Sequence, residues 1–496
     1  MLGTGGCVAV LVVSLLILQF LKMQWASRKL PPGPIPFPIL GTLWCFGFEW
    51  HQGSLSKFSK VYGKTFTIWI GHMPMVVLNG YHAVRDVLIN HSKETSWRIV
   101  TPFVRDTMHG KGILFSSGHT WKQQRRFGMM TLRTLGMGKK GLEYRVQEEA
   151  SYLVELFANT KGKPMDPSSF LFYSVSSVIS RVVFGHNFSI QDEIFHKLIE
   201  CIEYEGHFFL SSFHLLYELC PWLMRYLPGP HQKAFSCLEF IHSFSRKEIQ
   251  NHKEKKKLDD SWDFIDFYLE EIEKNKGDPS STFDEDNLLH VIYDLFTAGT
   301  DTIVSTLRWV FLCMVVHPDV QEKVQKEIDA VLTPSQCISY EDQKSMPYTS
   351  AVIYEILRFN FVLLAGTFRQ CGSDTTLLGF PIKKGTIIIV DIASALNDPE
   401  QWETPQQFNP NHFLDKDGNF FIREAFIPFS AGPRLCLGEK LAKTELFLFI
   451  TNVLRAFTLQ LPEGMTEVNT RPVEGRFAVQ AHPYVICAVP RKTIAA

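Results

Sequence analysis

Several features that assign a chain to a common functional class are missing from this sequence. The 50 Lys and Arg residues almost balance the 51 Asp and Glu residues, so no overall charge indicates a nucleic-acid partner. The ten cysteines include no C-x-x-C pair and no zinc-site spacing, which excludes the common zinc motifs and disfavours a disulfide framework. No G-x-S-x-G elbow of a hydrolase is present, and no repeat stands out. The chemistry of these 496 residues must therefore come from local motifs.

A long apolar run begins at the N-terminus. Residues 2–21 carry no charged side chain, and a helix of this length spans about 30 Å of hydrocarbon. Lys22, Arg28 and Lys29 follow the run, so the positive-inside rule places the rest of the chain in the cytosol. A cleaved signal peptide is the alternative, but the run lacks a charged n-region and a good cleavage site. We expect a single membrane span.

The remaining pattern predicts a mostly α fold behind this anchor. We expect an anchor and stop-transfer segment at residues 1–30, a stiff proline-rich connector at 31–41, and one large domain at 42–496. Amphipathic periodicity predicts helices at 81–90, 142–160, 191–206, 235–252, 264–274, 285–317, 318–332 and 349–359. Alternating β-branched residues predict minor strands at 64–80, 376–380, 386–393 and 484–489.

The segment 291–316 is also apolar, but it does not fit a second membrane span. It contains Asp294, Asp301 and Arg308, and a charge at the centre of a span costs about 2.5 to 3.5 kcal/mol on the insertion scale. A buried helix that crosses the core of the large domain is the better interpretation.

The stretch FSAGPRLCLGE at 429–439 places a cysteine directly before a strongly helical apolar run. Each residue has a role if Cys436 is a thiolate bound to haem iron. The amides that open the following helix stabilise the negative sulfur, and Phe429 shields it from water. Gly432 and Gly438 allow the backbone to approach a flat cofactor, and Arg434 can pair with a haem propionate.

This F-x-x-G-x-R-x-C-x-G pattern resembles the cysteine-ligand signature of the cytochrome P450 superfamily. The resemblance implies the cytochrome P450 fold, an α-helical haem domain with small β-sheets, so that 42–496 is a haem-thiolate catalytic domain. It also implies haem b as cofactor and O2 as co-substrate. Glu355 and Arg358 resemble the family's ExxR motif, and His412 falls where members close that ion-pair network. The expected role of these three residues is structural support of the haem pocket.

Further motifs follow in the family's order. Trp121 and Arg125 resemble its WxxxR motif, in which both side chains reach a haem propionate. Arg98 and Arg369 fall where members supply additional propionate contacts. Each of these positions is therefore expected to bind the cofactor.

The sequence AGTDT at 298–302 resembles the family's oxygen-activation motif on its long central helix. Small Ala298 and Gly299 leave room for dioxygen, and Gly299 permits local widening of the helix. Thr302 is expected to hydrogen-bond the bound oxygen and Asp301 to relay protons, so that the O–O bond breaks without release of peroxide. Taken alone, such a threonine more often bonds to its own backbone.

Local detail resembles vertebrate microsomal family 2, most of all its J subfamily. Such members are monooxygenases of the endoplasmic reticulum that oxidise xenobiotics and, in that subfamily, polyunsaturated fatty acids. Leu364 and Phe368 stand where relatives usually carry prolines, so the substrate preference should not be copied. The expected substrate pocket includes Phe115, Asp294, Ala298, Leu363, Leu364, Thr367, Phe477 and Ala478.

The resemblance also implies the partners. Electrons are expected from NADPH through NADPH-cytochrome P450 reductase, with cytochrome b5 as a further partner. A basic set from the cysteine side of the haem suits docking of an acidic protein: Lys122, Arg125, Arg126, Arg133, Lys139, Lys140, Arg423, Lys440 and Lys443. We expect a single-pass protein of the endoplasmic reticulum membrane with a cytosolic catalytic domain, in contact with membrane lipid and a lipophilic small-molecule substrate.

Two other functions remain open on the same fold. A hydroperoxide isomerase would rearrange its substrate without a reductase, and a haem sensor or lipid-binding protein would catalyse nothing. The Asp301-Thr302 pair argues against both, since neither function requires a proton relay.

Overall fold

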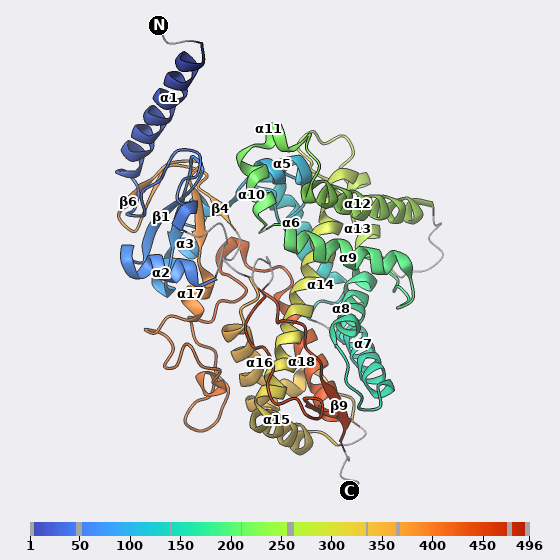
Figure 1. Cartoon of the computed structure of the whole chain (residues 1–496). Helices are drawn as coiled ribbons and strands as arrows, with labels where there is room; N and C mark the ends of the chain where they lie inside the picture. Colours follow the sequence, from blue (N-terminus) through green and yellow to red (C-terminus); the bar gives the residue numbers. More distant parts are fainter. Residues whose placement is uncertain are drawn as a thin grey trace.

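The computed structural model describes residues 4–45, 52–138, 140–209, 211–254, 262–333, 336–363, 368–473 and 479–491. Its helices are α1 (Thr4–Ser27), α2 (Gln52–Tyr62), α3 (Tyr81–Ile89), α4 (Ser92–Thr95), α5 (Pro102–Met108), α6 (Gly118–Thr134), α7 (Lys140–Asn159), α8 (Ser168–Val183), α9 (Glu193–Phe208), α10 (Ser212–Leu219), α11 (Pro221–Met224), α12 (Pro230–Glu254), α13 (Phe264–Lys274), α14 (Glu285–Val316), α15 (Pro318–Val331), α16 (Pro347–Phe359), α17 (Ile392–Leu396) and α18 (Glu439–Ala456). Its strands are β1 (Thr65–Ile70), β2 (Met73–Leu78), β3 (Trp97–Arg98), β4 (Arg369–Gln370), β5 (Thr375–Leu377), β6 (Phe380–Ile382), β7 (Ile387–Val390), β8 (Phe457–Gln460) and β9 (Cys487–Pro490). The mostly α fold with small sheets is confirmed (Figure 1).

The helices expected from periodicity are present within a few residues of their predicted ends. α8 lies outside those predictions, although it packs closely against α14. Its sequence is rich in serine and β-branched residues, which are weak helix formers, and it is buried on nearly all sides. The hydroxyls of Ser176 and Ser180 donate to the carbonyl oxygens of Phe172 and Ser176, each over 2.6 Å, so these buried polar groups are satisfied within the helix.

The main sheet joins the two ends of the large domain. Its strand order is β1-β2-β7-β4-β3, with β2 and β7 parallel and the other pairs antiparallel. The predicted strand pair at 64–80 is therefore confirmed, and the late strand β7 completes the same sheet. The register between β3 and β4 places Arg98 directly opposite Arg369, so two distant parts of the sequence meet at the edge of the sheet.

α14 runs through the helical half of the molecule, where α8, α9, α12, α16 and α18 surround it (Figure 1). The side chain of Asp284 caps its N-terminus by accepting from the Asn287 amide over 2.6 Å. Two helices among the described residues are long and apolar enough to cross a membrane, α14 and the span Gly6–Ser27 of α1. Since 72% of the apolar part of α14 is buried and 6% of that of α1, α14 is a core helix.

The connector after α1 lies against the sheet. The Thr67 amide of β1 donates to the Pro32 carbonyl oxygen over 2.8 Å, and Gly41 forms an antiparallel bridge with Ile70. A Cβ atom on Gly33 would lie 2.0 Å from the Thr67 carbonyl oxygen, so the close approach requires glycine. These contacts fix the direction in which α1 leaves the domain (Figure 1).

Candidate active site

Cys436 lies in the loop that precedes α18. Its amide donates to the Phe429 carbonyl oxygen over 3.0 Å, and α18 begins three residues later at Glu439. Burial raises the pKa of the Cys436 thiol, whereas the Gly438 amide and the positive charge of Arg125 act to lower it. The start of the helix therefore provides partial positive charge where a thiolate would need it.

A cavity of about 530 Å³ connects this loop with α14, and its lining is mostly apolar. The Cys436 side chain is accessible to solvent, although it lies deep in the molecule, because it faces this cavity. The sequence-predicted residues that line the cavity are Arg98, Phe115, Trp121, Arg125, Asp294, Ala298, Asp301, Thr302, Leu363, Phe429, Arg434, Cys436 and Gly438. Four other predicted pocket residues lie outside the described residues: Leu364, Thr367, Phe477 and Ala478.

Arg98 lines one edge of the cavity, and it forms a pair of like charges with Arg369, which is not among the lining residues. Their side chains oppose each other across β3 and β4, and the residues are only 7% and 1% exposed. Nε of Arg98 donates to the Leu114 carbonyl oxygen over 3.0 Å. Nη1 of Arg369 is buried and has no hydrogen-bond partner among the described residues. Like charges in such positions destabilise a strand pair, so this pair favours an anion beside it.

Arg434 and Trp121 contribute to the same edge. The Arg434 guanidinium carbon lies 4.0 Å from the centroid of the Trp121 ring, and its nitrogens donate to the carbonyl oxygens of Ser96 and Ser116 over 2.8 and 2.7 Å. The indole N–H of Trp121 is buried, and the described part of the chain offers it no acceptor. A buried indole N–H usually has a partner, so Trp121 is suited to bind an acceptor that enters the cavity.

The positive charges of this edge are poorly balanced by the protein. Burial and the neighbouring arginines lower the pKa of Arg98 to about 9 and that of Arg434 to about 8, and burial lowers the pKa of Arg369 to about 10. A guanidinium nevertheless stays charged in proteins, so the lowered values show that the cluster favours added negative charge. The two carboxylates of a haem would supply it, and the residues therefore fit the expected cofactor.

α14 places Asp301 and Thr302 at the cavity. The Thr302 hydroxyl donates to the Ala298 carbonyl oxygen over 2.7 Å, the local bond that such a threonine commonly makes. Oδ1 of Asp301 accepts from Nε2 of Gln480 over 3.1 Å. α14 continues without a break through Gly299, so local widening of the helix there stays a prediction. A Cβ atom on Gly299 would instead lie 3.2 Å from Cγ1 of Ile179, so the glycine allows α8 to pack closely.

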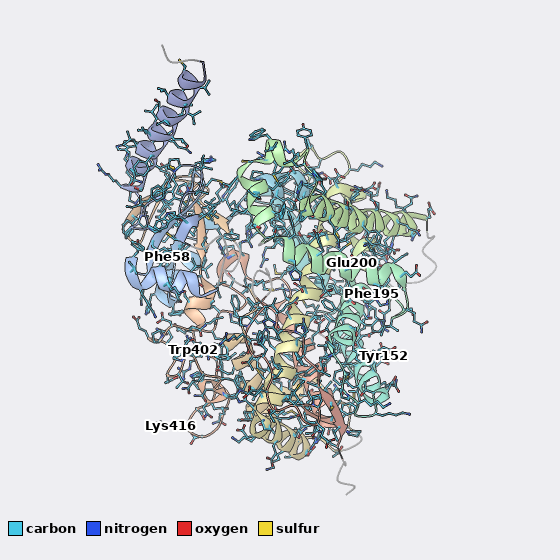
Figure 2. All side chains as sticks on the ribbon, in the orientation of Figure 1. Phe58, Tyr152, Phe195, Glu200, Trp402 and Lys416 are labelled. Carbon is cyan, nitrogen blue, oxygen red and sulfur yellow. The ribbon has the colours of Figure 1, made fainter. Side chains whose placement is uncertain are left out.

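The predicted ion-pair network is assembled in the core. Arg358 donates to both carboxylate oxygens of Glu355 over 2.7 Å, and both residues are fully buried. Nδ1 of His412 lies 3.1 Å from Oε2 of Glu355, and the Asn409 amide donates to Oε1 over 2.8 Å. The guanidinium also lies 5.1 Å from the ring of Trp402, which is labelled in Figure 2. This network connects α16 with the segment before the cysteine loop.

The two glycines of the cysteine motif have different surroundings. Gly432 has φ of +70°, and a Cβ atom there would lie 2.2 Å from the Leu88 carbonyl oxygen. Gly432 therefore allows the loop to pack against α3, which is not the role expected from sequence. Gly438 lines the cavity, and no described atom lies within 4 Å of the position of its Cβ, so it leaves the space that a flat cofactor needs.

Asp294 faces the cavity but is engaged by the backbone. Its Oδ2 accepts from the amides of Ile113 and Leu114 over 2.6 and 2.8 Å, and burial raises the pKa of its carboxyl to about 7. These bonds hold the segment that precedes α6. A contact between Asp294 and substrate stays a prediction.

Sequence reasoning missed Glu205 and Tyr293, which also line the cavity. Glu205 is on α9 and Tyr293 on α14, and the Tyr293 hydroxyl donates to Oε2 of Glu205 over 2.5 Å. A signal for Glu205 exists, because it lies on the apolar stripe formed by Leu198, Ile202 and Phe209 at helical spacing. An acid in that stripe must be buried.

Comparison with known proteins gives consistent results. A family model described as Cytochrome P450 matches residues 31–488. Human Cytochrome P450 2J2 is 39% identical over 482 residues, which cover 97% of this chain and 95% of the relative. Cytochrome P450 2C26 of Mesocricetus auratus is 39% identical over 484 residues, covering 97% and 99% of the two chains. Cytochrome P450 2A5 of Mus musculus is 38% identical over 492 residues, covering 98% and 100%. These matches confirm the resemblance to family 2, including its J subfamily.

Proposed function

Because the chain belongs to the cytochrome P450 family, we propose that this haem monooxygenase inserts one oxygen atom of O2 into lipophilic substrates in the cavity beside Cys436, using electrons from NADPH. The observation that carries the proposal is the convergence of three features on one apolar cavity. These features are the Cys436 loop, the buried arginine edge and the Asp301-Thr302 pair of α14. Hydroxylation and epoxidation of polyunsaturated fatty acids, steroids or xenobiotics are the reactions of this class that we propose.

The cofactor would be held at two places. Cys436 would supply a thiolate to the haem iron, and Trp121, Arg98 and Arg434, with Arg125 and Arg369, would bind the haem carboxylates. A thiolate-bound haem activates dioxygen and supplies the electron density that favours O–O cleavage. The remaining contributions come from side chains that exclude water, orient the substrate or hold a proton.

Asp301 and Thr302 would hold and donate protons where α14 lines the cavity. Asp301 is oriented by Gln480, and its second carboxylate oxygen lies 3.9 Å from the position of a Cβ atom on Gly206. Rotation of the Thr302 hydroxyl away from the Ala298 carbonyl oxygen would allow it to donate into the cavity. Positioned acids and donors of this kind contribute about 10²- to 10⁴-fold to a reaction that needs protons.

The membrane placement that we propose is single-pass, in the endoplasmic reticulum, with the catalytic domain in the cytosol. α1 exposes apolar side chains along its length, and Figure 1 shows α11 on the same side of the molecule as α1. Trp222 and Tyr226, at and just beyond α11, are 69% and 86% exposed. Aromatic residues of this type suit the membrane–water interface, so this side would contact lipid and admit lipophilic substrates.

The reductase would dock on the face of the domain that lies on the cysteine side of the cofactor, as would cytochrome b5. Lys122, Arg126 and Arg133 of α6 and Lys440 of α18 are exposed there. The segment that follows α6 and the start of α18 are neighbours, since a Cβ atom on Gly138 would lie 3.5 Å from Cδ of Lys440. Other members of the predicted basic set are engaged elsewhere. Arg423 pairs with Glu403 over 2.9 Å and Lys443 with Glu439 over 2.7 Å, while Lys139 and the Lys140 side chain lie outside the described residues.

Turnover by the purified, haem-loaded chain with reductase tests this function. Arachidonate, its hydroperoxide and neutral lipophilic compounds are each supplied with and without NADPH. We expect alcohols or epoxides that depend on NADPH, and we expect Cys436→Ala to lose both these products and the thiolate-haem spectrum. Products from the hydroperoxide alone would instead identify a reductase-independent isomerase.

A further inference from the structure

Glu205 is a buried acid in a cavity that is otherwise mostly apolar. The residue is 6% exposed, lies near the C-terminus of α9 and lines the same cavity as Cys436 and Thr302. A buried carboxyl without a structural partner is costly, so its presence on the apolar face of α9 calls for a physical reason. The exposed face of the same helix carries Glu200, which is labelled in Figure 2 and pairs with Lys197 and Lys233.

One oxygen of the Glu205 carboxyl accepts a hydrogen bond, and the other has no partner among the described residues. Oε2 accepts from the Tyr293 hydroxyl, whose own pKa is raised by burial and then by Glu205, so the phenol remains a donor. Oε1 is buried, and no hydrogen-bond partner for it exists in the described part of the chain. Because Tyr293 belongs to α14, it holds the carboxyl in one position relative to the helix that carries the proposed oxygen-activation residues.

We propose that Glu205 is the residue that selects substrates, and that it favours lipophilic amines whose protonated nitrogen donates a hydrogen bond to its carboxylate. This assignment rests on the proposed monooxygenase function of the cavity. The amine would be held at α9 while its apolar part extends along the lining towards Cys436.

The groups around Glu205 favour a cation over a carboxylate. Tyr293 of α14 and Cys237 of α12 are the neighbours that act on the carboxyl, and neither carries a positive charge. Asp301 of α14 lies near Gly206, the next residue, and His242 of α12 contacts the Tyr293 ring at a centroid distance of 6.1 Å. Burial lowers the pKa of His242 to about 4, so it is neutral at physiological pH. A substrate carboxylate would thus meet acids, and none of the described groups that act on Glu205 is a cation that could balance it.

A protonated amine also resolves the cost of burying the acid. Burial raises the pKa of Glu205 to about 8, so at pH 7 most of the free protein carries a proton on this carboxyl. A cation beside the carboxyl favours the ionised form, and the proton must then leave for the solvent. Binding of the amine at pH 7 is therefore coupled to release of a proton from the site, at most one per molecule bound.

Isothermal titration calorimetry on the haem-loaded full chain tests this inference without turnover. The three ligands have the same chain length and differ in charge. N,N-dimethyldodecylamine is a cation with one N–H at pH 7, and laurate is an anion. N,N-dimethyldodecanamide is neutral and can only accept hydrogen bonds. Titrations in buffers of different ionisation enthalpy give the number of protons released. We expect the amine to bind at least about tenfold more tightly than laurate and to release a clearly measurable fraction of a proton, at most one, at pH 7.

Two variants complete the test. Glu205→Gln should weaken amine binding at least about tenfold and abolish proton release, with little effect on the amide. Glu200→Gln, the same change on the exposed face of α9, should leave both quantities unchanged. Equal affinity of the amine for wild type and Glu205→Gln, or tighter binding of the amide or laurate, would overturn the inference. Amine binding with proton release but no turnover would support it while removing the monooxygenase function, so the two failures are distinguishable.

Discussion

Replacement of Glu355 by glutamine tests the buried ion-pair network. Glu355 accepts from Nε and Nη2 of Arg358, from the Asn409 amide and from the His412 ring, all within 3.2 Å. Glutamine keeps the shape but has one acceptor oxygen and no charge, so at least one of these donors would face an NH2 group. Arg358 would remain charged and fully buried, which typically costs about 3 to 5 kcal/mol of stability.

The matched control is Glu400→Gln at the surface. Glu400 pairs with Lys64 over 2.7 Å, and the two side chains are 56% and 49% exposed. An exposed pair contributes about 0 to 1 kcal/mol, because solvent screens it. Urea denaturation of the haem-loaded chains, followed by circular dichroism and haem absorbance, measures both effects. If the two variants lose the same stability, or if Glu355→Gln loses less than about 1 kcal/mol, the reasoning from burial is refuted.

Three further predictions follow from the same structure. Thr302→Ala should lower product formed per NADPH by about tenfold or more and raise peroxide correspondingly, and unchanged coupling would move the relay to another residue. Burial raises the pKa of Asp391 to about 6, so its contribution to stability is present at low pH and is lost as pH rises through 6. The stability of Asp391→Asn relative to wild type should therefore rise by up to about 3 kcal/mol between pH 4 and 8. A difference between the two urea midpoints that does not change with pH contradicts this. Arg126→Glu should slow reduction by the reductase at low salt, whereas Arg105→Glu on α5 should not; equal rates would remove the docking proposal.

The parts of the fold that sequence could predict are those whose signal is local. The strand pair β1 and β2 alternates around its own turn, and α13 carries a complete amphipathic period with a capping residue, Asp263. α8 lacks such a signal because it is buried on nearly all sides, and Ser176 and Ser180 bond within the helix instead of marking a polar face. Its helical state depends on packing against α14, which no short window of sequence contains.

The site residues fall into the same two groups, those that a local motif identifies and those that only the folded structure brings together. Cys436, Arg434 and Phe429 are close in sequence, so a motif could name them together. The opposition of Arg98 and Arg369 depends on the register of β3 and β4, which are far apart in the sequence. Resemblance to a family could suggest both positions, but only the register shows that their charges face each other and favour an anion.

Gly432 shows why a motif can be recognised without its physical basis. Sequence reasoning assigned both glycines of the motif to the cofactor, since glycine permits close approach of the backbone to a flat group. The close approach at Gly432 is to the Leu88 carbonyl oxygen of α3, so a side chain there would displace the loop rather than fill the cavity. Substitution at Gly432 would therefore act on the position of Cys436 through α3, whereas substitution at Gly438 would act on the space beside the sulfur directly.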